Sequence, residues 1–335
     1  MTRRERVYKA LHHEQPDYTP YQLDITSELS AKVAAHLGDS GFMEKVGNHL
    51  NIIEFGGFTE EPGCVFRDQF GIPWNRTVDK DIGIVQDYLL RSPSLKEYTL
   101  PDPKDCPLGE GFEAFLARVP DVLSFIGIGF SMFERAWTLR GMENLLVDMY
   151  ENPAFVDSLL DRITEYNLAL IDRALRFNLD GFRFGDDWGQ QNGLIMGPRL
   201  WRRFIKPRMA AMFQKAKEVG KYVMLHSCGN ISELFPDLIG MGLDIFNTFQ
   251  PEVMDVDLIK REYGKDLTFY GGISTQRVLP FASPEEVKAV VREMIRRVGK
   301  DGGYIVAPTH AMPRDIPPQN VVAFLEAVKN QERAD

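Results

Sequence analysis

Two side chains that commonly bind metal ions lie two residues apart in the run His226-Ser-Cys228-Gly-Asn. This run follows the strand-like stretch Tyr222 to Leu225, and residues two apart on an extended chain project to the same face. Neutral imidazole and thiolate are preferred zinc ligands, but two ligands are too few for a site. His310, which follows an apolar stretch ending at Ala307, is the best third candidate. The sequence therefore predicts a zinc site made of His226, Cys228 and His310.

A structural explanation of these residues stays open. A His and a Cys two apart also occur by chance, and a buried cysteine is usually an inert, small apolar side chain. The other two thiols, Cys64 and Cys106, lie in an irregular region beside prolines and glycines. We interpret both as structural thiols, although Cys64 becomes a zinc ligand if that region folds over the site.

The overall composition excludes several classes of protein. The chain has 335 residues, a net charge of −9 and a pI near 5.3, whereas nucleic-acid binding needs a basic face. Three cysteines and an opening without a secretory signal predict a reducing, cytoplasmic location. No apolar run approaches the roughly 20 residues that span a bilayer. We expect small-molecule and protein partners, and a homodimer is left open.

The metal-type residues need a frame that brings distant segments together. From about residue 120, short apolar runs alternate with segments of helical period, which is typical of parallel strands joined by crossover helices. The expected strands are Val122 to Phe130, Gly181 to Phe184, Tyr222 to Leu225, Leu243 to Thr248, Leu267 to Tyr270 and Gly303 to Ala307. The expected helices are Arg4 to His12, Pro153 to Asn178, Pro198 to Val219, Ile231 to Gly240, Asp255 to Tyr263, Pro284 to Val298 and Pro318 to Gln331.

These repeats, together with strands in the first third, predict a closed eight-stranded α/β barrel of the TIM type. We expect one domain over residues 1–335, with residues 44–107 as an irregular elaboration near the pocket mouth. An open doubly wound sheet is the alternative, but no Gly-x-Gly-x-x-Gly follows an early strand.

Polar residues follow several of these strands at their carboxyl ends, where barrel enzymes place their active sites. Asp186 and Asp187 come after Phe184, and Asn247 comes after Phe246. Each also has a structural explanation, because an aspartate can cap a helix and an asparagine can close a turn. Their convergence on one face of the barrel favours a functional site.

Four motifs carry a resemblance to a known family: His226-Ser-Cys-Gly-Asn-Ile, Gly185-Asp-Asp-Trp-Gly, Tyr270-Gly-Gly-Ile-Ser-Thr-Gln and Ala307-Pro-Thr-His-Ala-Met-Pro. Together they resemble the uroporphyrinogen decarboxylase superfamily, and within it the zinc-dependent methyltransferases that work with a corrinoid. The resemblance covers nearly the whole chain and is most specific between residues 181 and 320. It implies the eight-stranded barrel, a bound Zn²⁺, and a corrinoid carried by a partner protein.

The chain departs from the decarboxylase branch near its N-terminus. True uroporphyrinogen decarboxylases carry a Pro-Val-Trp-x-Met-Arg-Gln-Ala-Gly-Arg motif whose arginines hold substrate propionates. Here the sequence reads Thr19-Pro-Tyr-Gln-Leu-Asp24-Ile-Thr-Ser-Glu28, without an arginine. An acidic protein without such bidentate carboxylate clamps is poorly suited to a polyanionic tetrapyrrole.

The ligand set departs from the thiol-methylating members, which resemble this chain but use a His-x-Cys pair and a later Cys. The matching later position here is His310. One thiolate instead of two leaves zinc more positive and a better Lewis acid, which suits an ether oxygen. The resemblance then implies demethylation of a methoxylated aromatic, an aryl methyl ether, by a cobalt(I) corrinoid.

The remaining site predictions follow from this reaction. Aromatic and apolar side chains near strand ends suit a flat substrate. The expected substrate contacts are Phe130, Phe184, Trp188, Met196 and Asn247. Tyr270 could bind the developing phenolate, and Glu54 could be a fourth zinc ligand. Asp187, or alternatively Asp186 or Asp24, could orient a ligand imidazole.

Three alternatives stay open. The methyl group could travel the other way, from methyl-corrinoid to a thiol or folate acceptor. The chain could instead be a metal-free decarboxylase of another carboxylated substrate, or a noncatalytic binding protein that has kept the barrel.

Overall fold

The chain folds around a curled sheet of parallel strands. The computed structural model describes residues 1–61, 65–78, 83–108, 112, 115 and 121–332. Seven strands pair in the order β1-β6-β7-β10-β11-β12-β13. Their bounds are β1 Leu50–Glu54, β6 Leu123–Ile128, β7 Gly181–Gly185, β10 Tyr222–His226, β11 Ile245–Thr248, β12 Thr268–Ile273 and β13 Tyr304–Pro308. All six predicted apolar runs from residue 120 onward are therefore strands of this sheet.

An extended segment fills the eighth position of the barrel wall. Residues 20–23 lie beside β13, where Gln22 N donates to Val306 O at 3.0 Å and Val306 N donates to Pro20 O at 2.9 Å. On its other side His49 N donates to Tyr21 O at 3.2 Å, next to the start of β1. The predicted eight-stranded closure is thus achieved with seven regular strands and one short bridged segment among the described residues.

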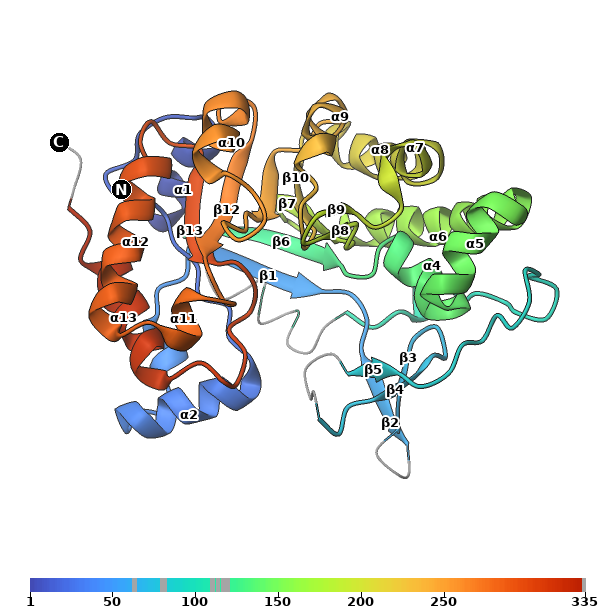
Figure 1. Ribbon diagram of the computed structural model, residues 1–335, viewed down its shortest axis with the longest axis horizontal. Helices are drawn as coiled ribbons and strands as arrows, with labels where there is room; N and C mark the ends of the chain where they lie inside the picture. The colour runs from blue at the N-terminus through green and yellow to red at the C-terminus, as the bar shows by residue number, and fades with distance from the viewer. Residues whose placement is uncertain (62–64, 79–82, 109–111, 113–114, 116–120, 333–335) are drawn as a thin grey trace.

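Helices follow the strands and cover the outside of the sheet (Figure 1). The α-helices are α1 Arg3–Leu11, α2 Ser27–Leu37, α4 Phe133–Arg140, α5 Met142–Glu151, α6 Pro153–Ala174, α7 Gly197–Leu200, α8 Lys206–Lys217, α9 Phe235–Gly240, α10 Val256–Tyr263, α11 Val278–Phe281, α12 Pro284–Val298 and α13 Pro318–Lys329. Shorter helical turns are η1 Phe42–Lys45, η2 Pro103–Asp105, the π-helical turn η3 Trp201–Ile205 and η4 Ser232–Leu234. No helix in these ranges is long and apolar enough to cross a membrane.

The region from residue 44 to 107 is more regular than predicted. It contains the barrel strand β1 and, after it, a four-stranded antiparallel sheet of β2 Phe58–Glu61, β3 Val65–Asp68, β4 Pro73–Asn75 and β5 Ile84–Val85. Figure 1 shows this sheet projecting from the carboxyl end of β1. Glycines and prolines separate its strands, which are only two to four residues long, so no regular sheet could be recognised from the sequence pattern. The small sheet supplies one wall of the cavity described below.

Candidate metal centre

The three predicted metal-type side chains lie together at the carboxyl end of the barrel. His226 is the last residue of β10, Cys228 follows in the loop, and His310 lies two residues beyond β13. Their ligand atoms all lie within 4.8 Å of one another, and the described residues contain no other such group of three or more. Cys228 Sγ is 3.8 Å from His226 Nε2. Zinc ligands at tetrahedral angles are about 3.3 to 3.8 Å apart, so small side-chain shifts would bring the three to one ion.

Asn247 fixes the orientation of His226. The two residues are partners in the β10–β11 register, and Asn247 Oδ1 lies 2.5 Å from His226 Nδ1. Asn247 Nδ2 donates to Tyr270 O at 2.9 Å, so its oxygen must face the imidazole and accept the Nδ1 proton. Nε2 then keeps its lone pair on the side of Cys228. Burial, followed by the positive charge of Arg183, lowers the pKa of His226 well below its ordinary value, which favours the neutral, metal-binding form.

Asn247 therefore takes the part that the sequence analysis gave to Asp187, Asp186 or Asp24. We expect Asn247→Leu to lower zinc affinity about 10- to 100-fold, because a ligand imidazole without its outer partner loses its orientation. Competition with a chromogenic chelator measures this. Asn320→Leu is the control, since Asn320 is also buried but donates to Leu279 O and Ala282 O, away from the site. Equal zinc affinities in the two variants would contradict the role of Asn247.

The Cys228 loop is held by hydrogen bonds and by two glycines. Cys228 N donates to Asp187 Oδ1 at 2.7 Å, and Gly229 N donates to Gln250 Oε1 at 2.7 Å. Gly229 has φ +80°, and a Cβ there would overlap the backbone at Gly189. These glycines let the loop after β7 pack directly against the loop after β10, which explains their place in the two motifs.

The surroundings of Cys228 fit a bound cation. Burial, followed by the charges of Asp187 and Glu134, raises the pKa of the Cys228 thiol. A divalent ion at the three donors would offset this cost and bind the thiolate directly. The three donors suit zinc. They are a neutral imidazole held by an amide, a thiol whose ionisation requires a nearby positive charge, and a second imidazole.

Asp186 is structural rather than catalytic. Its fully buried carboxylate accepts hydrogen bonds from the backbone N–H groups of Met132, Phe133 and Glu134, at 3.2, 2.9 and 2.8 Å, and from the indole of Trp188. It therefore caps the start of α4, one of the structural explanations considered above.

Three predicted substrate contacts point away from the site. The Trp188 ring is fully buried and packs against Trp201, with ring centroids 5.2 Å apart. Phe184 is also fully buried and faces the helices, 5.3 Å from the Phe213 ring. Met196 is buried at the start of α7 and lines neither cavity beside the three donors. Their predicted substrate contact is therefore corrected to a packing role.

Tyr270 also differs from its predicted role. Its side chain is 1% exposed inside the barrel, and its hydroxyl donates to Asp24 Oδ2. Burial, followed by the Asp24 charge, raises the pKa of Tyr270 well above its ordinary value. The hydroxyl is thus occupied and does not line the cavity, so the predicted contact with a phenolate is replaced by a contact within the barrel interior.

A cavity of about 450 Å³ opens beside the metal-type residues. Its described lining is Glu54, Phe55, Gly56, Gly57, Phe58, Asp68, Gln69, Trp74, Gly129, Phe130, Glu134, Arg135, Arg183, Gly185, Asp187, His226 and His310. Of the predicted residues, Phe130, Glu54, Asp187 and two of the three donors are among them. Phe130 packs edge-on against Trp74, with centroids 5.5 Å apart, so the antiparallel sheet and the barrel share an aromatic wall.

Glu54 lines this cavity and forms an ion pair with Arg183. Its Oε1 accepts from Arg183 Nη1, and its carboxylate lies over Gly127, where a Cβ would overlap it. It does not belong to the group of donors within 4.8 Å, so its service as a fourth zinc ligand stays a prediction that requires movement. Arg183 was not predicted as a site residue, although its place between Phe182 and Phe184 indicates which way its side chain points. If the two aromatic rings face the helices, alternation turns Arg183 inward.

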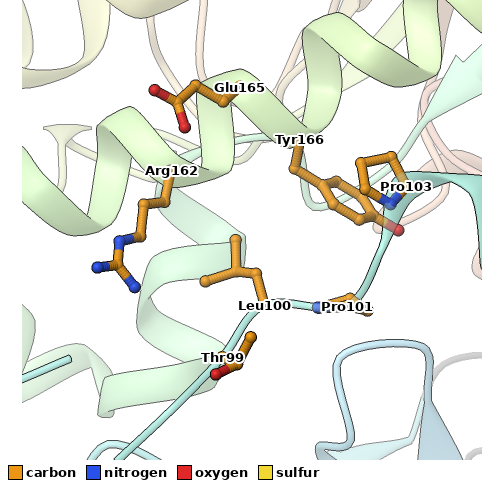
Figure 2. Close-up of a pocket in the computed structure, with 7 residues that line it drawn as sticks. All are labelled: Thr99, Leu100, Pro101, Pro103, Arg162, Glu165 and Tyr166. Atoms are coloured by element: carbon orange, nitrogen blue, oxygen red, sulfur yellow. The ribbon is translucent and has the colours of Figure 1, made fainter. Parts of the chain in front are cut away.

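Among the other hollows in the described part of the chain, two bear on the site prediction. One, of about 380 Å³, touches Cys228 and His310 and is otherwise lined by uncharged residues such as Gln190, Gln250 and Gln276. The other lies where the segment 99–103 passes α6 (Figure 2). Its lining is Thr99, Leu100, Pro101, Pro103, Arg162, Glu165 and Tyr166. None of the three metal-type residues His226, Cys228 and His310 lines this second hollow. Cys106 is buried, as expected of a structural thiol, whereas Cys64 lies outside the described residues.

Comparison with known proteins decides the family. Residues 78–331 match the family model described as uroporphyrinogen decarboxylase (URO-D). The chain belongs to the URO-D family. This confirms the resemblance drawn from the four motifs, all of which lie inside the matched range.

Two curated relatives of this URO-D chain carry different names. A uroporphyrinogen decarboxylase of Coxiella burnetii is 22% identical over 185 residues, which are 54% of this chain and 49% of the relative. A methylated-thiol–coenzyme M methyltransferase of Methanosarcina mazei is 23% identical over 212 residues, 63% of this chain and 54% of the relative. The chain thus spans about half the length of the curated relatives it matches.

A solved structure supports the fold of this URO-D chain. A methyltransferase from Methanosarcina mazei superposes with a TM-score of 0.74 at 18% identity, covering 98% of both chains. The TIM-barrel-like fold predicted from the sequence is therefore confirmed. At this identity the likeness concerns the fold, and the chemistry must be argued from the side chains.

Proposed function

We propose that this protein is a zinc-dependent methyltransferase that transfers the methyl group of a methoxylated aromatic to the cobalt(I) corrinoid of a partner protein. One observation carries the proposal: a donor set of two imidazoles and one thiol borders an aromatic-walled cavity of about 450 Å³. The methylated-thiol–coenzyme M methyltransferase among its curated relatives supports a methyl-transfer chemistry.

The residues of the chain have separate tasks in this reaction. Bound zinc would supply a Lewis acid for the ether oxygen. Phe130 and Trp74 hold a flat ring against the cavity wall, and Asn247 keeps His226 neutral and aimed at the donor group. Asp187 holds the Cys228 backbone in place. The corrinoid, as methyl acceptor, would supply the electron pair for the new bond to carbon, and the electron pair of the broken O–CH₃ bond would stay on the oxygen of the substrate.

Two alternatives remain within the family. The name of the Methanosarcina relative favours transfer to or from a thiol, but the single thiolate here argues for an oxygen ligand. Uroporphyrinogen decarboxylation is favoured by the other relatives, yet residues 19–28 offer no arginine to a propionate-bearing substrate. Its residues 20–23 instead fill the barrel wall, and Asp24, which follows them, is the partner of Tyr270.

A direct assay tests the proposal. Zinc-loaded protein, 2-methoxyphenol and chemically reduced cob(I)alamin are expected to give methylcobalamin and catechol, followed by the visible spectrum and by chromatography. Removing zinc with a chelator should slow the reaction at least about 100-fold, and zinc should restore it, because the metal stabilises the leaving oxygen. Absence of methylcobalamin over a panel of methoxyarenes, together with methylation of a thiol from methylcobalamin, would favour the reverse reaction.

A further inference from the structure

Both arginines that line the cavity are already paired with carboxylates. Arg135 Nη1 donates to Asp68 Oδ2 at 2.6 Å, and the two side chains are 5% and 4% exposed. Arg183 donates to Glu54, and the charge of Asp24 acts on it as well. Within the described lining, therefore, each cation has its own anion.

Two carboxylates in the same lining have no arginine partner. Glu134 and Asp187 both border the cavity, and Asp187 uses one oxygen to hold Cys228 N. Burial, with the charges of Asp187 and Asp186, raises the pKa of Glu134. A divalent ion bound with one thiolate would add one net positive charge. With this ion bound, the net charge of the cavity lining is −1 when Glu134 is ionised and zero when Glu134 is protonated.

This balance selects among aromatic ligands. A ring that carries a carboxylate would bring a further negative charge into a partly dry space where both lining arginines already have carboxylate partners, which is costly. A ring that carries a hydroxyl would find acceptors in Asp187 and Glu134 instead. The walls themselves are apolar, since Phe58, Trp74 and Phe130 pack edge to face at 5.9 and 5.5 Å.

We propose that the substrate is an uncharged, hydroxylated methoxyarene, a methoxyphenol rather than a methoxybenzoate, and that Glu54 enforces this choice by occupying Arg183. The inference rests on the proposed function for the methoxyarene itself and adds its charge and its hydroxyl. Glu54 acts here as a specificity-determining residue through its ion pair with Arg183.

Titration calorimetry with a matched pair of ligands tests the inference without methyl transfer. Zinc-loaded wild-type protein should bind 2-methoxyphenol at least about 30-fold more tightly than 2-methoxybenzoate, because the second ligand adds an unpaired charge. Glu54→Gln should free Arg183 and bring the two affinities to within about threefold. Glu60→Gln is the control, since this exposed carboxylate of β2 does not line the cavity, and it should keep the wild-type ratio.

A double variant guards against a trivial effect of Glu54→Gln. Glu54→Gln with Arg183→Met removes both charges, so the preference for the phenol should return. Tight binding of 2-methoxybenzoate by the wild type, or an unchanged ratio in Glu54→Gln, overturns the inference and leaves the proposed function standing. If the wild type binds neither ligand although it binds zinc, the inference and the methoxyarene substrate are overturned together.

Discussion

Replacing Cys228 with alanine is expected to lower zinc affinity at least about 1000-fold and to abolish measurable methyl transfer, because each ligand of a zinc site contributes several kcal/mol to binding. Cys228 is the one thiol in the group of donors, and its Sγ lies 3.8 Å from His226 Nε2. The two imidazoles that remain cannot complete a site by themselves. Zinc content after dialysis and chelator competition measure the loss.

Cys106→Ala is the matched control for Cys228→Ala. Cys106 is a buried thiol outside the donor group, so this change should leave zinc content and affinity at the wild-type level. His226→Ala should behave like Cys228→Ala, since its Nε2 faces the thiol. If both donor variants retained stoichiometric zinc, the metal would have to bind elsewhere, and the Lewis-acid role proposed for this site would fail.

The strands could be predicted from the sequence because strands buried on both faces read as continuous apolar runs. Tyr222 to Leu225 is such a run, and the structure extends it by one residue to His226 as β10. The juxtaposition of His226 and His310 also followed from the fold class, since both come at strand ends of one barrel. The way in which residues 20–23 close the barrel has no periodic pattern of its own, because it depends on three backbone hydrogen bonds over a short stretch.

The errors at the site have a common physical origin. Phe184 and Trp188 lie beside the aspartates in sequence, but this proximity does not assign their rings to one face of the strand, and both rings pack into the core. Strand alternation predicts that Arg183 points inward. It does not predict the ion pair of Arg183 with Glu54, which lies 129 residues away in the sequence. Such contacts depend on the register of distant strands, and no local pattern contains that register.

Asp186 shows how a residue at an active-site strand end can serve the fold. Its carboxylate accepts hydrogen bonds from the first N–H groups of α4 and from the indole N–H of Trp188. These contacts connect β7, α4 and the loop before β8 Gly189–Gln190. The same loop continues from Asp187, which holds the Cys228 backbone. The geometry of the proposed metal site thus depends on a capping interaction that takes no part in the proposed chemistry.

Replacing Asp186 with alanine is therefore expected to lower the free energy of unfolding by about 3 to 5 kcal/mol, because it leaves several buried N–H donors without an acceptor. The matched control is Asp255→Ala, which removes an exposed cap of α10 that accepts from Asp257 N and Leu258 N. That change should cost only about 1 kcal/mol, since water can replace the lost acceptor. Urea unfolding followed by circular dichroism measures both, and equal losses would show that burial of the α4 cap adds nothing.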